Sequence, residues 1–254
     1  MTKRPLILLT NDDGIAADSL AVAASVLSQN ADVVVVAPSG EQSAASHRIT
    51  LSGPIRVTCL REGWYAVDGS PADCVYLAAA VLDGGIVPDL VVSGPNRGLN
   101  LGTDVFYSGT VAGAMEGALR GFPAIALSAP RMAGESHWKQ AARLAYEMWR
   151  ILDWSGLREV TVNVNLPEGP IKGLRWTAMG RRHYPLEAKI CSDPFGRTYY
   201  WIGGQGLGTY EGAQGEDAQA VRDGFVSASF IGLDLTVAVP SLPDPERILH
   251  AEKR

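Results

Sequence analysis

The sequence predicts an α/β fold, in which a doubly wound and mostly parallel sheet carries a projecting hairpin from its C-terminal third. Three observations support this fold class. Short apolar runs end in turn residues, as strands buried on both faces do. Helical patterns fall between these runs, and alternating strands and helices favour a parallel sheet with right-handed crossovers. In the last third, proline, glycine and aromatic residues become more frequent and the alternation fades.

The expected strands are four continuous apolar runs, each bounded by turn residues. The first covers residues 6–10 and stops at Asn-Asp-Asp-Gly, and the second covers residues 33–36. The third, residues 90–92, is expected to stop at Ser-Gly-Pro-Asn, and the fourth covers residues 124–127. Runs of this length between glycine, proline and asparagine residues are typical of buried strands.

Three helices are expected between these strands. Asp18 is placed to cap the first, and Ser70 is placed to cap the second, ahead of a proline at its first position. The third helix opens near Ser108. Its Gly113 and Gly117 lie four residues apart, so this helix can approach the sheet closely.

The last third of the chain is expected to complete the fold. Residues 161–165 alternate like a strand, and residues 198–202 form another strand beside two glycines. We expect a projecting hairpin or arm at about residues 181–207. The chain then divides into a core at residues 1–153 that carries the site and a C-terminal part at residues 154–254.

The composition is that of a globular protein. The chain has 254 residues, of which 46% are hydrophobic and 19% charged, with a net charge of -5. These values exclude a disordered chain and argue against binding to duplex nucleic acid, which needs a basic face. The three cysteines form no Cys-x-x-Cys pair and are expected to be reduced thiols. No apolar run could span a membrane and no signal-peptide pattern is present, so we expect a cytoplasmic protein without a membrane partner.

Four polar loops hold the residues that could carry chemistry. They cover residues 11–14, 39–46, 93–100 and 108–110, and each follows a strand or opens a helix. A doubly wound sheet would bring all four to the edge formed by the carboxyl ends of its strands, where such sheets bind ligands. That edge would hold two carboxylates, several amide and hydroxyl oxygens, and a helix N-terminus.

The acidic pair Asp12-Asp13 is the strongest candidate among these residues. Adjacent carboxylates repel each other, and a hard cation would neutralise the pair. Oxygen ligands without histidine or cysteine suit Mg²⁺ or Mn²⁺ better than Zn²⁺. The helix that opens at Ser108 offers unpaired N–H groups to a phosphate, and Gly109 allows close backbone approach.

Plainer interpretations compete with these. Asn-Asp-Asp-Gly is also a good turn without any function, and Ser108 could be only a helix cap. Cys191 and Arg197 have the spacing found in cysteine phosphatases, but Pro194 removes an N–H that a phosphate loop needs, which favours an exposed turn. The chain has no P-loop motif, and no dinucleotide-binding glycine pattern follows its first strand.

Several stretches in the first half carry a family signature, in a fixed order and spacing. They are residues 9–14 (Leu-Thr-Asn-Asp-Asp-Gly), 36–38, 42–44, 46–50, 69–74, 92–98 and 107–117. In these motifs the chain resembles the SurE survival-protein family of 5′/3′-nucleotidases. The likeness is looser in the last third, at residues 163–167 and 223–227.

The resemblance implies a site and an activity on a Rossmann-like core. The implied ligands of a divalent metal are Asp12, Asp13, Ser43 and Asn96. The implied phosphate and substrate residues are Asn11, Asn100, Ser108, Gly109 and Thr110. The resemblance also implies hydrolysis of nucleoside monophosphates, and a homodimer or homotetramer built through the C-terminal hairpin.

Our hypothesis is therefore metal-dependent hydrolysis of 5′- and 3′-nucleoside monophosphates, with Mg²⁺ or Mn²⁺ bound and Asp12 steering the attacking water. The alternative is a non-catalytic nucleotide- or phosphate-binding module on the same sheet. That module keeps the helix N-terminus but needs no metal. Removal and return of the metal during an assay of phosphate release would separate the two.

Overall fold

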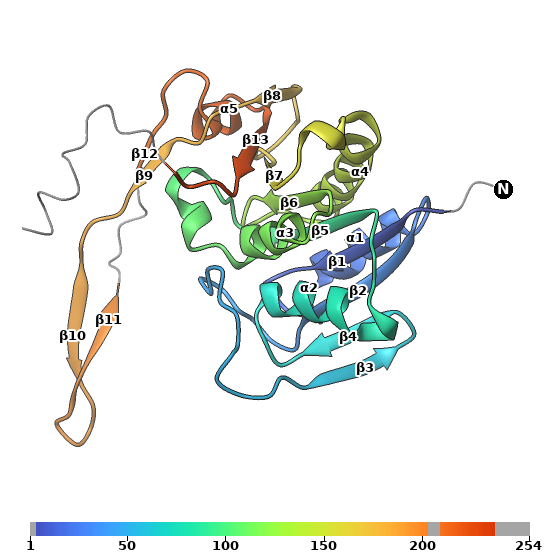
Figure 1. The fold of residues 1–254 in the computed structure, drawn as a ribbon. Helices are drawn as coiled ribbons and strands as arrows, with labels where there is room; N and C mark the ends of the chain where they lie inside the picture. Colours follow the sequence, from blue (N-terminus) through green and yellow to red (C-terminus); the bar gives the residue numbers. More distant parts are fainter. Residues whose placement is uncertain (1–3, 203–208, 237–254) are drawn as a thin grey trace, which may run out of the picture.

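The computed structural model describes residues 4–202 and 209–236, and these residues form a mostly parallel nine-stranded sheet with helices on both faces (Figure 1). In sheet order the strands are β3 (Val57–Arg61), β4 (Trp64–Val67), β2 (Asp32–Pro38), β1 (Leu6–Thr10), β5 (Leu90–Arg97), β6 (Ala124–Ala129), β7 (Val160–Asn165), β13 (Val226–Gly232) and β8 (Leu174–Trp176). The pairs β3–β4 and β7–β13 are antiparallel, and the other neighbours are parallel. The α/β class expected from the sequence is confirmed.

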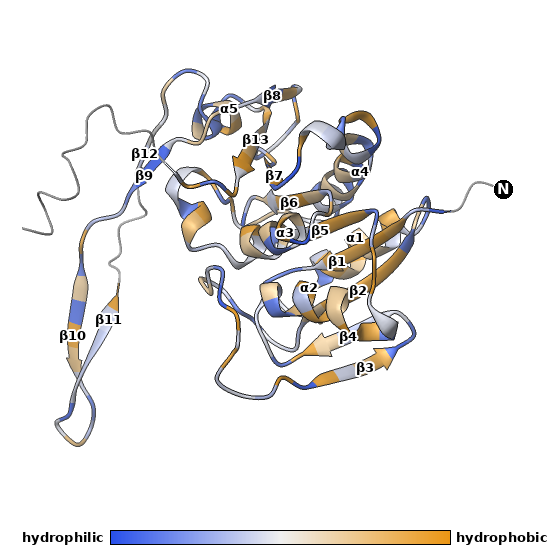
Figure 2. Ribbon diagram, in the orientation of Figure 1, coloured by the Kyte–Doolittle hydropathy of each residue, from blue (hydrophilic) through white to orange (hydrophobic). Residues whose placement is uncertain are grey.

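The strands separate two hydrophobic cores because successive side chains point to opposite faces of the sheet. Ile7 and Leu9 of β1 pack in one core with α1 (Asp18–Leu27) and α4 (Glu135–Ile151). Leu8 packs in the other core with α2 (Pro71–Ala80) and α3 (Gly109–Leu119). Figure 2 shows that the central strands are mainly apolar, as strands buried on both faces are. The shorter helices are η1 (Leu82–Gly84), η2 (Gly102–Phe106), η3 (Trp154–Gly156) and α5 (Asp217–Arg222).

Two local expectations are wrong. Strand β5 does not stop at Ser93 but continues to Arg97, because it pairs with β6 again after an irregularity between Ser93 and Asn96. Pro95 lies in that irregular stretch, where its missing N–H interrupts the ladder least. The N-cap of α1 is Ala17, which makes no side-chain capping bond, and Asp18 lies instead in the first turn of the helix.

The starts of α2 and α3 follow the prediction, with Ser70 and Ser108 as their N-caps, and two glycines let α3 lie close to the sheet. Ser70 and Asp73 form a capping box at α2, with main-chain to side-chain bonds of 3.1 and 2.8 Å. In α3, a Cβ on Gly113 would lie 2.9 Å from Ser93 Oγ, and a Cβ on Gly117 would lie 2.8 Å from Val91 Cβ. The two glycines therefore allow the close approach that brings the N-terminus of α3 to the carboxyl ends of β1 and β5.

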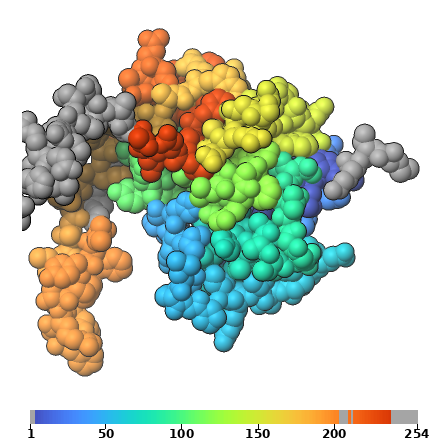
Figure 3. Space-filling view, viewed as in Figure 1, coloured from blue at the N-terminus to red at the C-terminus, as the bar shows by residue number. Residues whose placement is uncertain are grey.

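The arm consists of two antiparallel strand pairs. β9 (Arg181–His183) pairs with β12 (Thr209–Glu211) at its base, and β10 (Ala188–Ser192) pairs with β11 (Thr198–Ile202) farther out. Figure 1 shows β10 and β11 projecting from the body, and in Figure 3 this segment (orange) stands apart from the rest. The expected projecting hairpin is confirmed, and residues 203–207 of its expected range lie outside the described residues.

The turn after β10, the cysteines and the helices each bear on a smaller expectation from the sequence. In the turn after β10, Asp193 accepts the N–H groups of Phe195 and Arg197 at 2.8 and 2.9 Å, so this stretch is a hairpin turn, as the sequence favours. The three cysteines are free thiols. Within the described ranges, no helix combines the length and apolar character needed to cross a lipid bilayer.

Candidate active site

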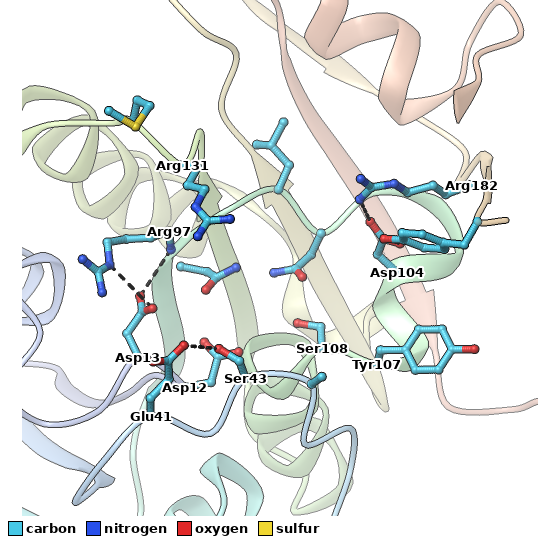
Figure 4. Close-up of a pocket in the computed structure, with 16 residues that line it drawn as sticks. Asp12, Asp13, Glu41, Ser43, Arg97, Asp104, Tyr107, Ser108, Arg131 and Arg182 are labelled. Carbon is cyan, nitrogen blue, oxygen red and sulfur yellow. Dashed lines mark hydrogen bonds and ion pairs between the residues drawn. The ribbon is translucent and has the colours of Figure 1, made fainter. Parts of the chain in front are cut away.

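A cleft of about 790 Å³ opens at the edge of the sheet where β1, β2, β5 and β6 end (Figure 4). This is the edge at which the sequence placed the four polar loops. The residues that line the cleft are Asp12, Asp13, Glu41, Ser43, Ala44, Asn96, Arg97, Leu99, Asn100, Asp104, Tyr107, Ser108, Arg131, Met132, Arg182 and Tyr184. They come from the strand-end loops, from η2 and from the base of the arm.

Asp12 is almost fully buried beside the N-terminus of α3, with 5% of its surface exposed. Its Oδ1 accepts a hydrogen bond of 2.5 Å from the Thr110 hydroxyl, and its Oδ2 accepts one of 3.1 Å from the Thr110 N–H. Burial raises the pKa of Asp12 to about 6, although both hydrogen bonds act in the opposite direction. The ionised carboxylate is therefore costly unless a cation compensates it.

Asp13 lies on the same wall of the cleft and has one cationic partner. Its Oδ1 lies 3.6 Å from Arg97 Nε, and its Oδ2 accepts the Arg97 N–H at 3.3 Å. Burial nevertheless raises the pKa of Asp13 above its usual value, with Arg97 opposing the change. The buried carboxylate of Asp12 and the partly buried carboxylate of Asp13, of which only Asp13 is paired with Arg97, leave a negative site that favours a divalent cation.

The hydroxyl and amide oxygens implied by the family resemblance lie in the same cleft. Ser43 Oγ donates a hydrogen bond of 2.7 Å to Glu41 Oε1, and Asn96 Nδ2 donates one of 2.9 Å to the Gly98 carbonyl. In the described part of the chain, no three histidine, cysteine or acidic side chains form a group that could hold a metal. A cation at Asp12 and Asp13 would therefore draw on oxygens such as these, a donor set that fits Mg²⁺ or Mn²⁺.

The first turn of α3 uses most of its N–H groups within the protein. Ser108 caps the helix, because its Oγ accepts the Val111 N–H at 3.0 Å. The Thr110 N–H goes to Asp12. Among the described residues the Gly109 N–H has no acceptor, so it is available to an anion. A Cβ on Gly109 would lie 3.0 Å from Asp12 Cβ, which explains why a glycine stands there.

Asn100 is held by a buried polar network under the cleft. Its N–H donates to Asn165 Oδ1 at 2.8 Å, and its Nδ2 donates to Ser128 Oγ at 2.8 Å. Its carbonyl accepts bonds of 2.8 and 3.1 Å from the side chains of Asn163 and Asn165. These partners lie on β6 and β7, so the sheet itself fixes the position of Asn100.

The structure brings most of the predicted site residues to one cleft. Those that line it are Asp12, Asp13, Ser43, Asn96, Asn100 and Ser108. Gly109 and Thr110 lie behind them and contact Asp12. Asn11 is fully buried and donates from Nδ2 to the Gly14 carbonyl at 3.0 Å, so it holds the turn that presents the acidic pair.

Sequence reasoning missed the cationic side chains of the cleft. Arg97 and Arg131 both line it, and Figure 4 shows the Arg131 side chain pointing into it. Arg97 lies inside a polar loop that the sequence had singled out, and Arg131 lies two residues beyond the end of β6. A search for charged residues just beyond every strand end would have found both.

Sequence reasoning also missed the end of the cleft at the base of the arm. Asp104 of η2 accepts hydrogen bonds of 2.5 Å from Arg182 Nη1, 2.8 Å from the Tyr184 hydroxyl and 3.1 Å from the Tyr210 hydroxyl. The Arg182 guanidinium lies 4.7 Å from the centre of the Tyr184 ring and 4.6 Å from that of Tyr210. These partners are far apart in the sequence and form no local motif, so no sequence pattern points to them.

Comparisons with known proteins bear on this cleft. The profile of a family described as "Survival protein SurE" matches residues 7–185. A protein of Sorangium cellulosum named "5'-nucleotidase SurE" is 47% identical over 92% of this chain and 92% of its own length. One of the same name from Syntrophotalea carbinolica is 46% identical over 91% and 92%. The crystal structure of the SurE protein from Aquifex aeolicus superposes with a TM-score of 0.78 at 36% identity, over 91% of this chain and 95% of that one.

Proposed function

This chain belongs to the SurE family, and we infer that it is a phosphomonoesterase, a 5′-nucleotidase that hydrolyses nucleoside monophosphates to nucleoside and phosphate. One observation in the structure carries the assignment. The acidic pair, with Asp12 buried and Asp13 partly buried, lies at the carboxyl edge of the sheet beside the N–H of Gly109, which has no acceptor among the residues that the structure describes, so a cation and a phosphate can be held side by side there. The reaction transfers the phosphoryl group from the ester oxygen to water.

We propose that Asp12, Asp13, Ser43 and Asn96 hold a divalent cation, with Mg²⁺ or Mn²⁺ as the ion that fits their oxygens. The fit rests on the two carboxylates, because burial raises the pKa of each and Arg97 opposes this change only at Asp13. When bound, such a cation polarises a phosphoryl oxygen and lowers the pKa of a coordinated water.

Asp12 is the residue that we propose to steer the attacking water. Both of its oxygens are oriented by Thr110, so the carboxylate cannot rotate freely. A fixed carboxylate beside the phosphate holds a water in one direction, and such positioning supplies much of the catalysis in phosphoryl transfer. Thr110 would thus act through Asp12 rather than on the substrate.

The phosphoryl group would be bound by the N–H of Gly109, the hydroxyl of Ser108 and the side chain of Asn100. Ser108 Oγ accepts the N–H of Val111, so its own proton stays free to be donated to a phosphate oxygen. Asn100 Nδ2 uses one of its two N–H groups on Ser128 and keeps the other. Arg97 and Arg131 also line the cleft and add positive charge near Asp13, where Figure 4 shows both side chains.

An assay of phosphate release tests the function. Purified protein would be treated with EDTA, then supplied with Mg²⁺ or Mn²⁺, and offered 5′- and 3′-mononucleotides. We expect activity to disappear with EDTA and to return with metal, with 5′-nucleotides hydrolysed. Binding of nucleotides without any metal-restorable hydrolysis would instead favour the non-catalytic module.

We also propose that residues 1–153 carry the metal and phosphate site and that residues 154–254 complete the fold and provide the arm, through which two or four copies of the chain associate. The outer strands of the arm expose apolar side chains, with exposed fractions of 69% for Ile190, 63% for Trp201 and 96% for Ile202. Such a surface favours burial against another chain. Replacing Ile190 and Trp201 by serine should convert the assembly to a monomer in analytical ultracentrifugation, and an unchanged mass would refute this role.

A further inference from the structure

The cleft is larger than a phosphoryl group requires. Its volume of about 790 Å³ lies in the range of pockets that enclose whole organic ligands. The acidic pair, Ser43 and Ser108 account for one part of it, and Figure 4 shows Asp104, Tyr107 and Arg182 at the other side from Asp13. The chemistry of this second part differs from that of the first.

Two exposed tyrosines line this second part of the cleft. Tyr107 is 63% exposed and Tyr184 is 52% exposed. Tyr107 directly precedes Ser108, so it is the neighbour in sequence of a residue of the proposed phosphate site. Its backbone is fixed, because the Tyr107 carbonyl accepts the Ser46 N–H at 3.0 Å.

The ring of Tyr184 is held from two directions. Its hydroxyl donates to Asp104 at 2.8 Å, and the guanidinium of Arg182 covers the ring at 4.7 Å. Asp104 also binds Arg182. The Thr103 hydroxyl donates to the Arg182 carbonyl at 3.1 Å and accepts the Arg182 N–H at 3.2 Å. An aromatic ring held in this way loses little conformational entropy when a planar ligand stacks on it.

We propose that Tyr107 and Tyr184 form the nucleobase platform of the cleft, with Asp104 and Arg182 as the positioning pair that holds Tyr184. The inference rests on the proposed function, because the phosphate end fixes where the rest of a nucleotide must extend. Aromatic faces accept every base by stacking, so the platform recognises a base without selecting one by hydrogen bonds. The arm thereby contributes through its base to substrate binding.

The test compares a substrate that has a base with one that lacks it. AMP and ribose 5-phosphate carry the same phosphomonoester, so only AMP should depend on the platform. We expect Tyr107→Ala and Tyr184→Ala to lower kcat/KM for AMP by about tenfold or more, mainly through KM, as loss of an aromatic stacking partner does. Their kcat/KM for ribose 5-phosphate should stay within about twofold of the wild-type value, because no stacking partner is lost.

Two further variants separate stacking from damage to the fold. Phe106 is 60% exposed and adjacent to Tyr107 but does not line the cleft, so Phe106→Ala should leave both substrates unaffected. Tyr107→Phe keeps the ring and should retain the preference for AMP. Adenosine should inhibit hydrolysis of ribose 5-phosphate competitively in the wild-type protein and more weakly in Tyr107→Ala.

The outcomes decide between the two proposals. An equal loss on AMP and ribose 5-phosphate in the alanine variants, no loss on AMP, or an effect of Phe106→Ala as large as that of Tyr107→Ala overturns the platform and leaves the nucleotidase assignment in place. A wild-type protein that hydrolyses neither substrate with Mg²⁺ or Mn²⁺ overturns the proposed function, and the platform with it.

Discussion

Replacing Asp12 by asparagine should remove activity and at the same time stabilise the metal-free protein. The two effects have one cause, which is the burial of a carboxylate with 5% of its surface exposed. Asparagine has nearly the same shape and can still accept a hydrogen bond from Thr110. It brings no charge to the site, so it would neither help to hold a cation nor steer a water as an anion does. We expect kcat for AMP to fall by orders of magnitude.

The stability effect follows from the pKa of Asp12, which burial raises from 3.8 to about 6. Between these two pH values the folded state binds more protons than the unfolded state, so stability falls as pH rises through this window. At about 1.36 kcal/mol for each pKa unit, the full effect above the folded-state pKa is about 3 kcal/mol. The positive end of α3 beside Asp12 acts against the effect, so this is its upper limit. Metal-free Asp12→Asn should therefore be more stable than the wild-type protein at pH 8, with a difference that fades below about pH 4.

Urea denaturation in EDTA at pH 8, pH 6 and pH 4 measures this difference. Addition of Mn²⁺ should then raise the stability of the wild-type protein much more than that of the variant, because only a folded site binds the ion. A variant that is less stable than wild type at pH 8, or a difference that does not change with pH, would refute the account of Asp12 as a buried and uncompensated charge. Near-wild-type turnover of AMP would refute its catalytic role.

Three further predictions concern the supports of the site. Thr110→Val removes the hydroxyl that donates to Asp12. Because a hydrogen bond to a charged group is lost, kcat should fall about tenfold to a hundredfold while the circular dichroism spectrum stays unchanged. An unchanged kcat would show that Asp12 needs no such support. Gly109→Ala places a Cβ 3.0 Å from Asp12 Cβ and should lower kcat, whereas Gly134→Ala meets nothing within 4 Å and should not; equal activities of the two variants would contradict this. Asn165→Leu leaves a buried main-chain N–H without its acceptor and should destabilise the protein by about 1–3 kcal/mol in urea denaturation, and an unchanged midpoint would count against that network.

The parts of the fold that could be predicted from the sequence are those with a local cause. The strand at residues 6–10 is apolar over residues 6–9 because it is buried on both faces, and the Ser70 capping box lies within four residues. Strand β5 was predicted too short because its second half depends on pairing with β6, which no local pattern reports. Asp18 was likewise predicted one position too early in the helix. The N-cap is Ala17, which makes no side-chain capping bond that a sequence pattern could report.

The same distinction applies to the site. Asp12 and Asp13 could be found because they follow a predicted strand, and the rule for doubly wound sheets says what lies there. Asp104 and Arg182 could not, because they are 78 residues apart and meet only when the base of the arm docks on η2. Neither Asp104 nor Arg182 lies in the stretches that carry the family resemblance, so the resemblance assigned no role to them.

The contacts of Asp12 change the role of the helix that the sequence assigned to the phosphate. The first amides of α3 were expected to face the substrate, but the N–H of Thr110 binds Asp12 and that of Val111 binds Ser108. The positive end of the helix therefore acts first on a carboxylate, and it favours the ionised form that a cation needs. Only the Gly109 N–H remains for the phosphoryl group among the described residues at this helix start. Asp12 and the phosphate thus share one helix end, and this explains why a side chain at position 109 would disturb both.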